Sequence, residues 1–233
     1  MAPDPVLALL HTSPVHVPVF DALRDEDHPG LVLRHAVDES LLDRARAHGP
    51  ESVAGAVEAA VAAQVAAGAN AVLCTCSTIG ALAELTAQGV PVLRVDRPMA
   101  SAAATWQRVV VVASVESTVG PTVRLIREEA APRVPEVRAL LVEDAWALFE
   151  AGERERYLAT VAAAVDGVHD ADVIVLAQAS MADAAGLART AVPVLSSPRP
   201  GLAAAARAAG MNPAHRGTRS GRPRARRDPP DAP

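Results

Sequence analysis

The chain has 233 residues, of which 50% are hydrophobic, 21% charged and 2% aromatic, and its formal net charge is -5. The apolar half of the chain can build a sizeable core, which excludes global disorder, and the length allows one large domain or two small lobes. No apolar run approaches the roughly 20 residues that a membrane-spanning helix needs, and two cysteines cannot form a disulfide framework. We therefore expect a cytoplasmic protein that does not contact a membrane. The scarcity of aromatic residues makes nucleic acid an unexpected partner.

Short apolar runs alternate with alanine-rich stretches along the chain. The runs that we expect to form strands are Val6–Leu10, Leu31–His35, Ala71–Cys76, Pro91–Val95, Arg108–Ala113, Arg138–Val142, Val173–Ala177 and Pro193–Leu195. The helical patterns are Ser52–Ala67, Ser117–Ala130, Arg154–Val165 and Pro200–Ala209. Strands that are apolar on both faces and separated by helices are typical of parallel sheets covered on both sides. The sequence therefore predicts the α/β class.

The chain contains an internal repeat with an offset of 102 residues. Residues 69–78 match residues 171–180, and both segments read as a strand that runs into a small, hydroxyl-rich turn. With the same offset, Val-Pro-Val-Leu occurs at 90–93 and again at 192–195. A match without gaps over this distance indicates a duplicated structural unit rather than a coincidence of alanine and valine runs.

Two pseudo-symmetric lobes are the expected result of this repeat, one over residues 1–104 and the other over 105–198. Each would be a mostly parallel sheet flanked by helices, and we expect the last helix, 199–210, to return to the first lobe. The remaining residues, 211–233, hold six arginines and five prolines but only two acidic residues. Such a segment cannot bury apolar surface, so we expect a disordered tail. We favour a solvated tail over a nucleic-acid-binding arm, because the complete lack of lysine suggests a GC-rich coding bias.

Polar side chains, most of them with a hydroxyl group, follow the carboxyl ends of the expected strands, where ligands bind in sheets of this kind. The residues concerned are His11, Thr12, Ser13, Cys76, Ser77, Thr78, Asp96, Arg97, Ser114, Gln178, Ser180, Ser196 and Ser197. Many hydroxyls beside few charges suit a small carboxylate, held by hydroxyls and by turn amides. The chain has no G-x-G-x-x-G or Walker sequence, and no histidine lies at ligand spacing from the Cys74-x-Cys76 pair. We therefore expect neither a cofactor nor a metal.

Several of these features together resemble the aspartate/glutamate racemase superfamily, which includes hydantoin racemases, maleate isomerases and arylmalonate decarboxylases. They are the paired lobes, the strand followed by Cys76-Ser77-Thr78, and the opening Leu-His-Thr-Ser-Pro at residues 10–14. The resemblance covers about residues 5–210. It implies a cofactor-independent enzyme with its active site in a cleft between the lobes. It also implies two cysteines, one from each lobe, on opposite faces of the substrate α-carbon.

Carried over residue by residue, the resemblance places Cys76 at the first-lobe cysteine position. It implies that four hydroxyl-bearing residues help to hold the substrate carboxylate, namely Thr12, Ser13, Ser77 and Thr78. The repeat, however, puts Gln178 where the second cysteine should be, and Gln178 and Ser180 become further substrate-binding candidates. An amide is neither an acid nor a base near neutral pH, so two-thiol racemisation is not available to this chain. Cys74 cannot replace the missing thiol, because it shares a strand with Cys76.

Single residues allow more than one interpretation. Cys76 could be a small buried core residue, but we favour a catalytic thiol because it ends a strand in the expected cleft. His11 is a possible acid or base, and a structural hydrogen-bonding role is equally plausible. We expect His16 at the surface. Asp96 and Arg97 either bind substrate or pair with each other, and we favour the pair.

The sequence supports hypotheses from two classes. In the first, a racemase-like isomerase acts at the α-carbon of a small carboxylate or amino acid through the single Cys76 thiolate. A one-cysteine decarboxylase or cis–trans isomerase is a variant of that hypothesis. In the second, a catalytically silent protein of the same fold binds small anions. A homodimer is possible in either case.

Overall fold

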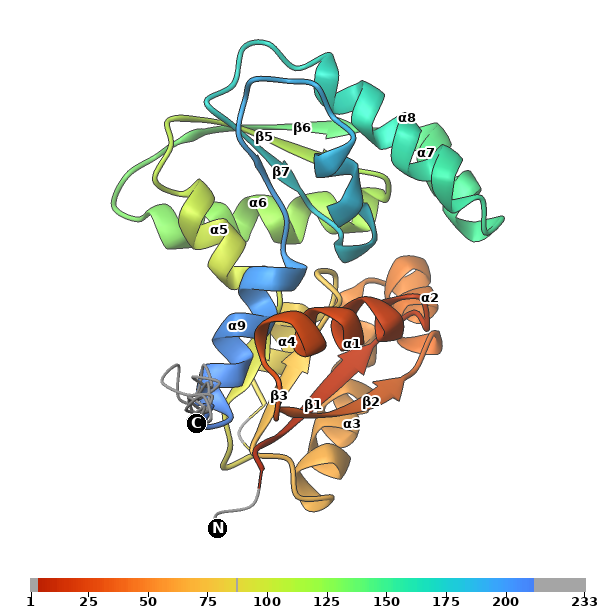
Figure 1. Cartoon of the computed structure of the whole chain (residues 1–233), viewed down its shortest axis with the longest axis vertical. Helices are drawn as coiled ribbons and strands as arrows, with labels where there is room; N and C mark the ends of the chain where they lie inside the picture. Colours follow the sequence, from red (N-terminus) through yellow and green to blue (C-terminus); the bar gives the residue numbers. More distant parts are fainter. Residues whose placement is uncertain (1–3, 87, 212–233) are drawn as a thin grey trace, which may run out of the picture.

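The computed structural model describes residues 4–86 and 88–211, which form two lobes, each built on a four-stranded parallel sheet (Figure 1). The first sheet has the order β2-β1-β3-β4, with β1 Val6–His11, β2 Val32–Val37, β3 Ala71–Cys74 and β4 Val92–Arg94. The second has the order β6-β5-β7-β8, with β5 Arg108–Ala113, β6 Glu136–Leu141, β7 Val173–Leu176 and β8 Val194–Leu195. The predicted α/β class is confirmed. Every expected strand forms. The central strands β1, β3, β5 and β7 are buried along almost their whole length, which gives them continuous apolar runs, whereas the edge strands β2 and β6 are partly exposed.

The predicted repeat is also a repeat of strand register. In the first sheet Leu7 pairs with Ala71, and in the second Val109 pairs with Val173, which is the same pairing 102 residues later. The backbone N–H of Val6 donates to Asn70 Oδ1 over 2.8 Å. At the equivalent position of the second lobe, the backbone N–H of Arg108 donates to Asp172 Oδ2, also over 2.8 Å. The two lobes therefore begin their sheets with the same side-chain contact.

The helices connect the strands and cover both faces of each sheet (Figure 1). In the first half of the chain they are α1 His16–Asp27, α2 Ser40–His48, the 3₁₀ turn η1 Pro50–Val53, α3 Ala54–Ala66, α4 Gly80–Glu84 and α5 Arg97–Ala103. In the second half they are α6 Glu116–Ala130, α7 Glu143–Glu150, α8 Arg154–Asp166, the 3₁₀ segment η2 Ala179–Gly186 and α9 Pro198–Ala208. The four helical patterns expected from the sequence correspond to α3, α6, α8 and α9. No helix of the described residues is long and apolar enough to cross a membrane.

Two helices are exchanged between the lobes. Helix α5 follows β4 of the first sheet, but its buried residues Met99 and Ala103 pack with Val109 and Val111 of the second. Helix α9 follows β8 of the second sheet and packs on the first, beside α1 (Figure 1). Packing thus assigns α5 to the second lobe, whereas the expected boundary at residue 104 left it in the first.

The physical reason is that the buried face of α5 completes the apolar cover of β5 and β7. We therefore propose lobes of 4–96 with 198–211, and of 97–197. The disordered tail was expected over residues 211–233. Met211 instead packs against the first-lobe core and donates to the Ala206 carbonyl over 2.9 Å, and residues 212–233 lie outside the described part of the chain.

Candidate active site

A cleft lies between the lobes, where the carboxyl ends of the two sheets face each other. It has a volume of about 450 Å³, which includes its opening to solvent. Its lining residues are Thr12, Ser13, His16, Leu42, Thr75, Cys76, Ser77, Thr78, Val115, Thr118, Trp146, Phe149, Gln178, Ala179 and Ser180. This set includes every residue that the sequence proposed for substrate binding or as the catalytic thiol. It does not include His11.

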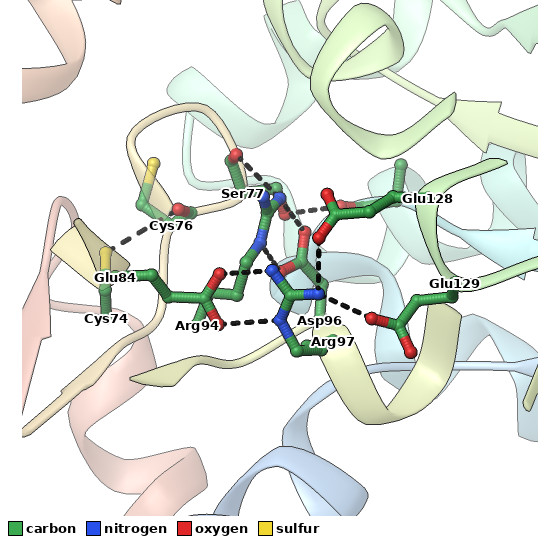
Figure 2. Close-up of polar contacts among 10 residues, drawn as sticks. Cys74, Cys76, Ser77, Glu84, Arg94, Asp96, Arg97, Glu128 and Glu129 are labelled. Atoms are coloured by element: carbon green, nitrogen blue, oxygen red, sulfur yellow. Dashed lines mark hydrogen bonds and ion pairs between the residues drawn. The ribbon is translucent and has the colours of Figure 1, made fainter. Parts of the chain in front are cut away.

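Cys76 is the ionisable sulfur that reaches the cleft. Strand β3 ends at Cys74, and of residues 71–80 Cys76 alone is partly exposed while its neighbours are buried. Cys74 is fully buried in the first-lobe core, and its thiol donates to the Cys76 carbonyl over 3.7 Å. Burial raises the pKa of the Cys74 thiol far above its usual range, so this sulfur stays protonated. Figure 2 shows the Cys76 side chain directed away from Cys74.

Gln178 lies across the cleft from the Cys76 turn, at the matching position of the repeat. Its Oε1 accepts hydrogen bonds from the backbone N–H of Ser114 over 2.7 Å and from the Ser114 hydroxyl over 3.1 Å. With its carbonyl oxygen occupied in this way, the glutamine has its NH₂ group to offer to a ligand.

Behind Gln178, a buried tyrosine supports the second-lobe wall. The Tyr157 hydroxyl lies 2.8 Å from Ser180 Oγ and 3.5 Å from Ser114 Oγ. Burial raises the pKa of Tyr157, so the phenol is neutral at physiological pH. Sequence reasoning missed this residue, although it is the one tyrosine of the chain and lies on a predicted helix.

His11 is buried beneath the cleft floor rather than in it. The Thr75 hydroxyl donates to the Leu10 carbonyl over 3.2 Å, so the Nδ1–H of His11 is the donor in the 2.8 Å bond to Thr75 Oγ1. The Nε2 of His11 then accepts from His35 Nδ1, also over 2.8 Å. Burial, together with the nearby His16 and His35, lowers the pKa of His11 to about 3. The neutral ring therefore connects β1, β2 and the residue next to Cys76.

His16, which the sequence placed at the surface, lines the cleft, and that expectation was wrong. The turn after β1 brings the first residue of α1 over the opening, and this tertiary placement has no local sequence signal. Burial lowers the pKa of His16 to about 4, so the imidazole is unprotonated at neutral pH. It is the second group in the lining that can accept a proton.

The expected pairing of Asp96 with Arg97 is wrong, and neither residue lines the cleft. Asp96 is buried against Arg94, whose Nε and Nη2 donate to its two carboxylate oxygens over 2.6 and 2.8 Å (Figure 2). Arg94 Nη2 also donates to the Ser77 carbonyl over 3.4 Å. The Ser77 hydroxyl in turn donates to the Ala177 carbonyl of the other lobe over 2.8 Å. A buried ion pair thus holds the back of the Cys76 turn.

Comparison with known proteins decides the family. The sequence model of the Asp/Glu/hydantoin racemase family matches residues 16–209. The chain belongs to the Asp/Glu/hydantoin racemase family. Among curated proteins, none matches the chain in sequence.

Solved structures of racemases and of a decarboxylase share the two-lobed fold of this family member. Picrophilus torridus aspartate racemase is 16% identical with a TM-score of 0.69, over 88% of this chain and 94% of that one. Thermus thermophilus glutamate racemase, in complex with β-chloro-D-alanine, is 20% identical with a TM-score of 0.63, over 89% and 81%. A glycine-to-cysteine variant of arylmalonate decarboxylase, in a sulfate-associated form, is 21% identical with a TM-score of 0.60, over 88% and 94%.

The second lobe of this racemase-family chain adds an aromatic wall that sequence reasoning also missed. Trp146 and Phe149 of α7 line the cleft with their rings stacked, 4.9 Å between centroids. Arg46 of the first lobe lies over the Trp146 ring at 5.1 Å. In residues 4–86 and 88–211, no cluster of three or more His, Cys, Asp or Glu side chains is placed to hold a metal ion.

Proposed function

We propose that this family member is a cofactor-independent enzyme that acts at the α-carbon of a small carboxylate through the Cys76 thiolate. Both lobes bring their strand ends to one cleft, and its ionisable sulfur faces a glutamine rather than a second thiol. This pairing of one thiol with one amide is the observation that carries the proposal. It favours chemistry on a single face of the substrate over symmetric racemisation.

The carboxylate would be held by neutral donors. Among the described residues, no arginine or lysine lines the cleft. Thr12, Ser13, Thr78 and Ser180 supply hydroxyl groups around it. We assign Ser77 to holding the turn, because its hydroxyl already donates to the Ala177 carbonyl. The Gln178 NH₂ group adds a donor that can stabilise negative charge on the carboxylate as it develops.

The proton steps follow from these groups. Cys76 as a thiolate removes the α-proton, which leaves an enediolate and a thiol, and the thiol returns a proton to the same face. In a lyase reaction, a substrate with two carboxylates on the α-carbon loses one as CO₂, and the Cys76 thiol protonates the resulting enediolate. The one-sided site favours the lyase reaction as the second candidate, because decarboxylation needs an acid on one face only.

A catalytically silent anion-binding protein is the rival from a different class, and the reactivity of Cys76 separates the two. We expect iodoacetamide to alkylate Cys76 rapidly at neutral pH, since a catalytic thiol must be reactive there. A thiol that reacts only in strongly alkaline solution would support the silent binder. The Cys76→Ala variant should show no alkylation at neutral pH, because Cys74 is buried.

Isotope exchange tests the reaction itself. Small carboxylates and amino acids are incubated with the enzyme in deuterated water, and α-deuterium is measured by mass spectrometry. We expect exchange with retention of configuration, lost in Cys76→Ala and largely kept in Cys74→Ala. Efficient racemisation by the wild type would show that another group, with His16 the first to test, works on the opposite face.

A further inference from the structure

The candidate active-site cleft adjoins a second, larger cavity, here called the side chamber. This chamber has a volume of about 670 Å³, including its opening, and shares the side chains of His16, Phe149, Ala179 and Ser180 with the cleft. The two cavities are therefore adjacent, and a substituent on a ligand held beside Cys76 would have the side chamber next to it.

The side chamber is lined mainly by apolar groups from both lobes. Val15 and Val19 come from the start of α1, and Phe149, Ala179 and Ala182 come from the second lobe. Gly152, which adopts a φ of +74° in the turn between α7 and α8, contributes no side chain to fill the space. Surfaces of this composition accept apolar groups and give little stabilisation to a charge.

The two charged side chains that line the side chamber neutralise each other. Arg154 and Asp183 both line it and form an ion pair with each other, with side chains that are more than half exposed. Within residues 4–86 and 88–211, no arginine or lysine lines the cleft itself. Among these residues, a second carboxylate on the substrate would therefore find no unpaired cation along either wall.

Phe149 lines both the cleft and the side chamber and belongs to a cluster of aromatic rings. Phe149 stacks on Trp146 and also lies 5.3 Å from the Tyr157 ring centroid, at a tilt of 56°. The Trp146 Nε1 atom is buried and has no acceptor among the described residues. A ligand acceptor in the cleft would satisfy this donor, and an apolar ring beside Phe149 would gain stacking contacts.

We infer that the substrate of this site is a carboxylate whose α-substituent is uncharged and bulky, an aryl or branched alkyl group, and that the side chamber holds this substituent. The inference rests on the proposed function, because it takes the carboxylate to lie beside Cys76. It excludes a second, distal carboxylate such as those of aspartate and glutamate.

Three carboxylate probes test this inference by calorimetry and by protection of Cys76 from iodoacetamide. Acetate contains only the carboxylate with a methyl group, succinate adds a distal carboxylate, and phenylacetate adds an aromatic ring. We expect phenylacetate to bind and to protect at a concentration at least tenfold below that needed for succinate or acetate. Binding of succinate as tight as that of phenylacetate would overturn the inference and leave the proposed function standing.

A variant locates the aromatic ring in the side chamber. Ala182→Phe fills the chamber. We therefore expect phenylacetate to bind this variant no more tightly than acetate does, while acetate binds it as tightly as it binds the wild type. Ala159→Phe, on the exposed face of α8, is the matched control, and it should still bind phenylacetate more tightly than acetate by the wild-type factor. If Ala182→Phe prefers phenylacetate over acetate as strongly as the wild type does, the aromatic ring does not lie in the side chamber. Failure of all three probes to bind or protect would overturn the carboxylate site, and the proposed function with it.

Discussion

Gln178 shows how a single side chain sets which chemistry the cleft can support. It stands at the repeat position of Cys76, and its oxygen is held by two donors of Ser114 at the end of β5. These bonds fix the amide in one orientation, with its NH₂ group free to donate. The first lobe therefore contributes two titratable side chains to the cleft lining, Cys76 and His16, and the second lobe contributes neutral donors and aromatic rings.

Restoring a thiol at this position should restore chemistry on the second face. We expect Gln178→Cys to racemise a carboxylate that the wild type exchanges with retention, because the new thiol stands opposite Cys76. The gain is limited by geometry, since a displacement of about 1 Å can cost on the order of a hundredfold in rate. Chiral chromatography of the product measures it. Gln178→Ser is the control that removes the amide without adding an acid, and racemisation by that variant would contradict the argument.

His11 makes the folded state sensitive to acid. Its pKa is about 3 in the folded protein and ordinarily 6.5, so below pH 6.5 the unfolded chain binds a proton that the folded chain does not. Stability is therefore complete above about pH 6.5 and is lost progressively as the pH falls toward 3. Between pH 7 and pH 5 the loss from this group is on the order of 2 kcal/mol, at about 1.4 kcal/mol per pKa unit.

Urea unfolding of wild type and His11→Gln at both pH values measures this contribution. Between pH 7 and pH 5 the free energy of unfolding should fall less in the variant than in the wild type, by on the order of 2 kcal/mol. The variant is less stable overall, since it loses the bonds to Thr75 and His35, but the comparison uses only the difference between pH values. An equal fall in both proteins would assign the acid sensitivity to other groups, with His16 the next to examine.

At the scale of elements, one glycine fixes the position of the exchanged helix α9. A Cβ atom added at Gly201 would lie 2.4 Å from the Val95 carbonyl oxygen and 2.6 Å from Val95 Cγ2. The obstacle is main chain at the end of β4, so a side-chain rotation cannot relieve it. Helix α9 can cross β4 this closely only because residue 201 has no side chain.

We therefore expect Gly201→Ala to lower the free energy of unfolding by about 1–3 kcal/mol, as overpacking of a core does. Gly55→Ala is the matched control, because a Cβ there meets nothing within 4 Å and the residue lies in α3. That substitution should instead stabilise the protein by about 0.5–1 kcal/mol. Chemical denaturation gives both values, and a neutral Gly201→Ala would mean that α9 shifts without cost.

The sequence predicted the elements better than their placement. The central strands were readable because burial on both faces makes them apolar along almost their whole length. The repeat gave the correspondence of Cys76 with Gln178. His16 and Trp146 were missed, because their place in the cleft depends on how α1 and α7 pack and has no local pattern. The exchange of α5 was missed although that of α9 was expected. The repeat implies both, since α5 and α9 follow equivalent strands, β4 and β8.

At the scale of the molecule, the exchanged helices carry equivalent arginine contacts. Arg97, at the start of α5, binds Glu128 and Glu129 at the end of α6, and it also forms a bidentate pair with Glu84 (Figure 2). Arg199, at the start of α9, binds Glu26 and Asp27 at the end of α1. All three residues of the second contact lie 102 positions from their counterparts. The repeat therefore preserved the ionic contacts together with the strands.

The Arg97 contact joins the lobes beside the active site, because Glu84 ends α4 and α4 directly follows the Cys76 turn. We expect Arg97→Gln to lower the free energy of unfolding by about 1 kcal/mol at low salt, more than an isolated surface pair contributes, because three carboxylates lose one partner. The loss should shrink in about 1 M salt, where the Debye length falls to about 3 Å.

Arg138→Gln is the control for this effect. Among the described residues Arg138 pairs with Asp170 alone, on the surface of one lobe, so its loss should cost little. The second measurement is the rate at which iodoacetamide alkylates Cys76. If Arg97 holds the two walls of the cleft together, its removal should raise that rate, and the Arg138 variant should leave it unchanged. A destabilised Arg97→Gln protein with an unaltered alkylation rate would show that the cluster supports the fold without setting the width of the cleft.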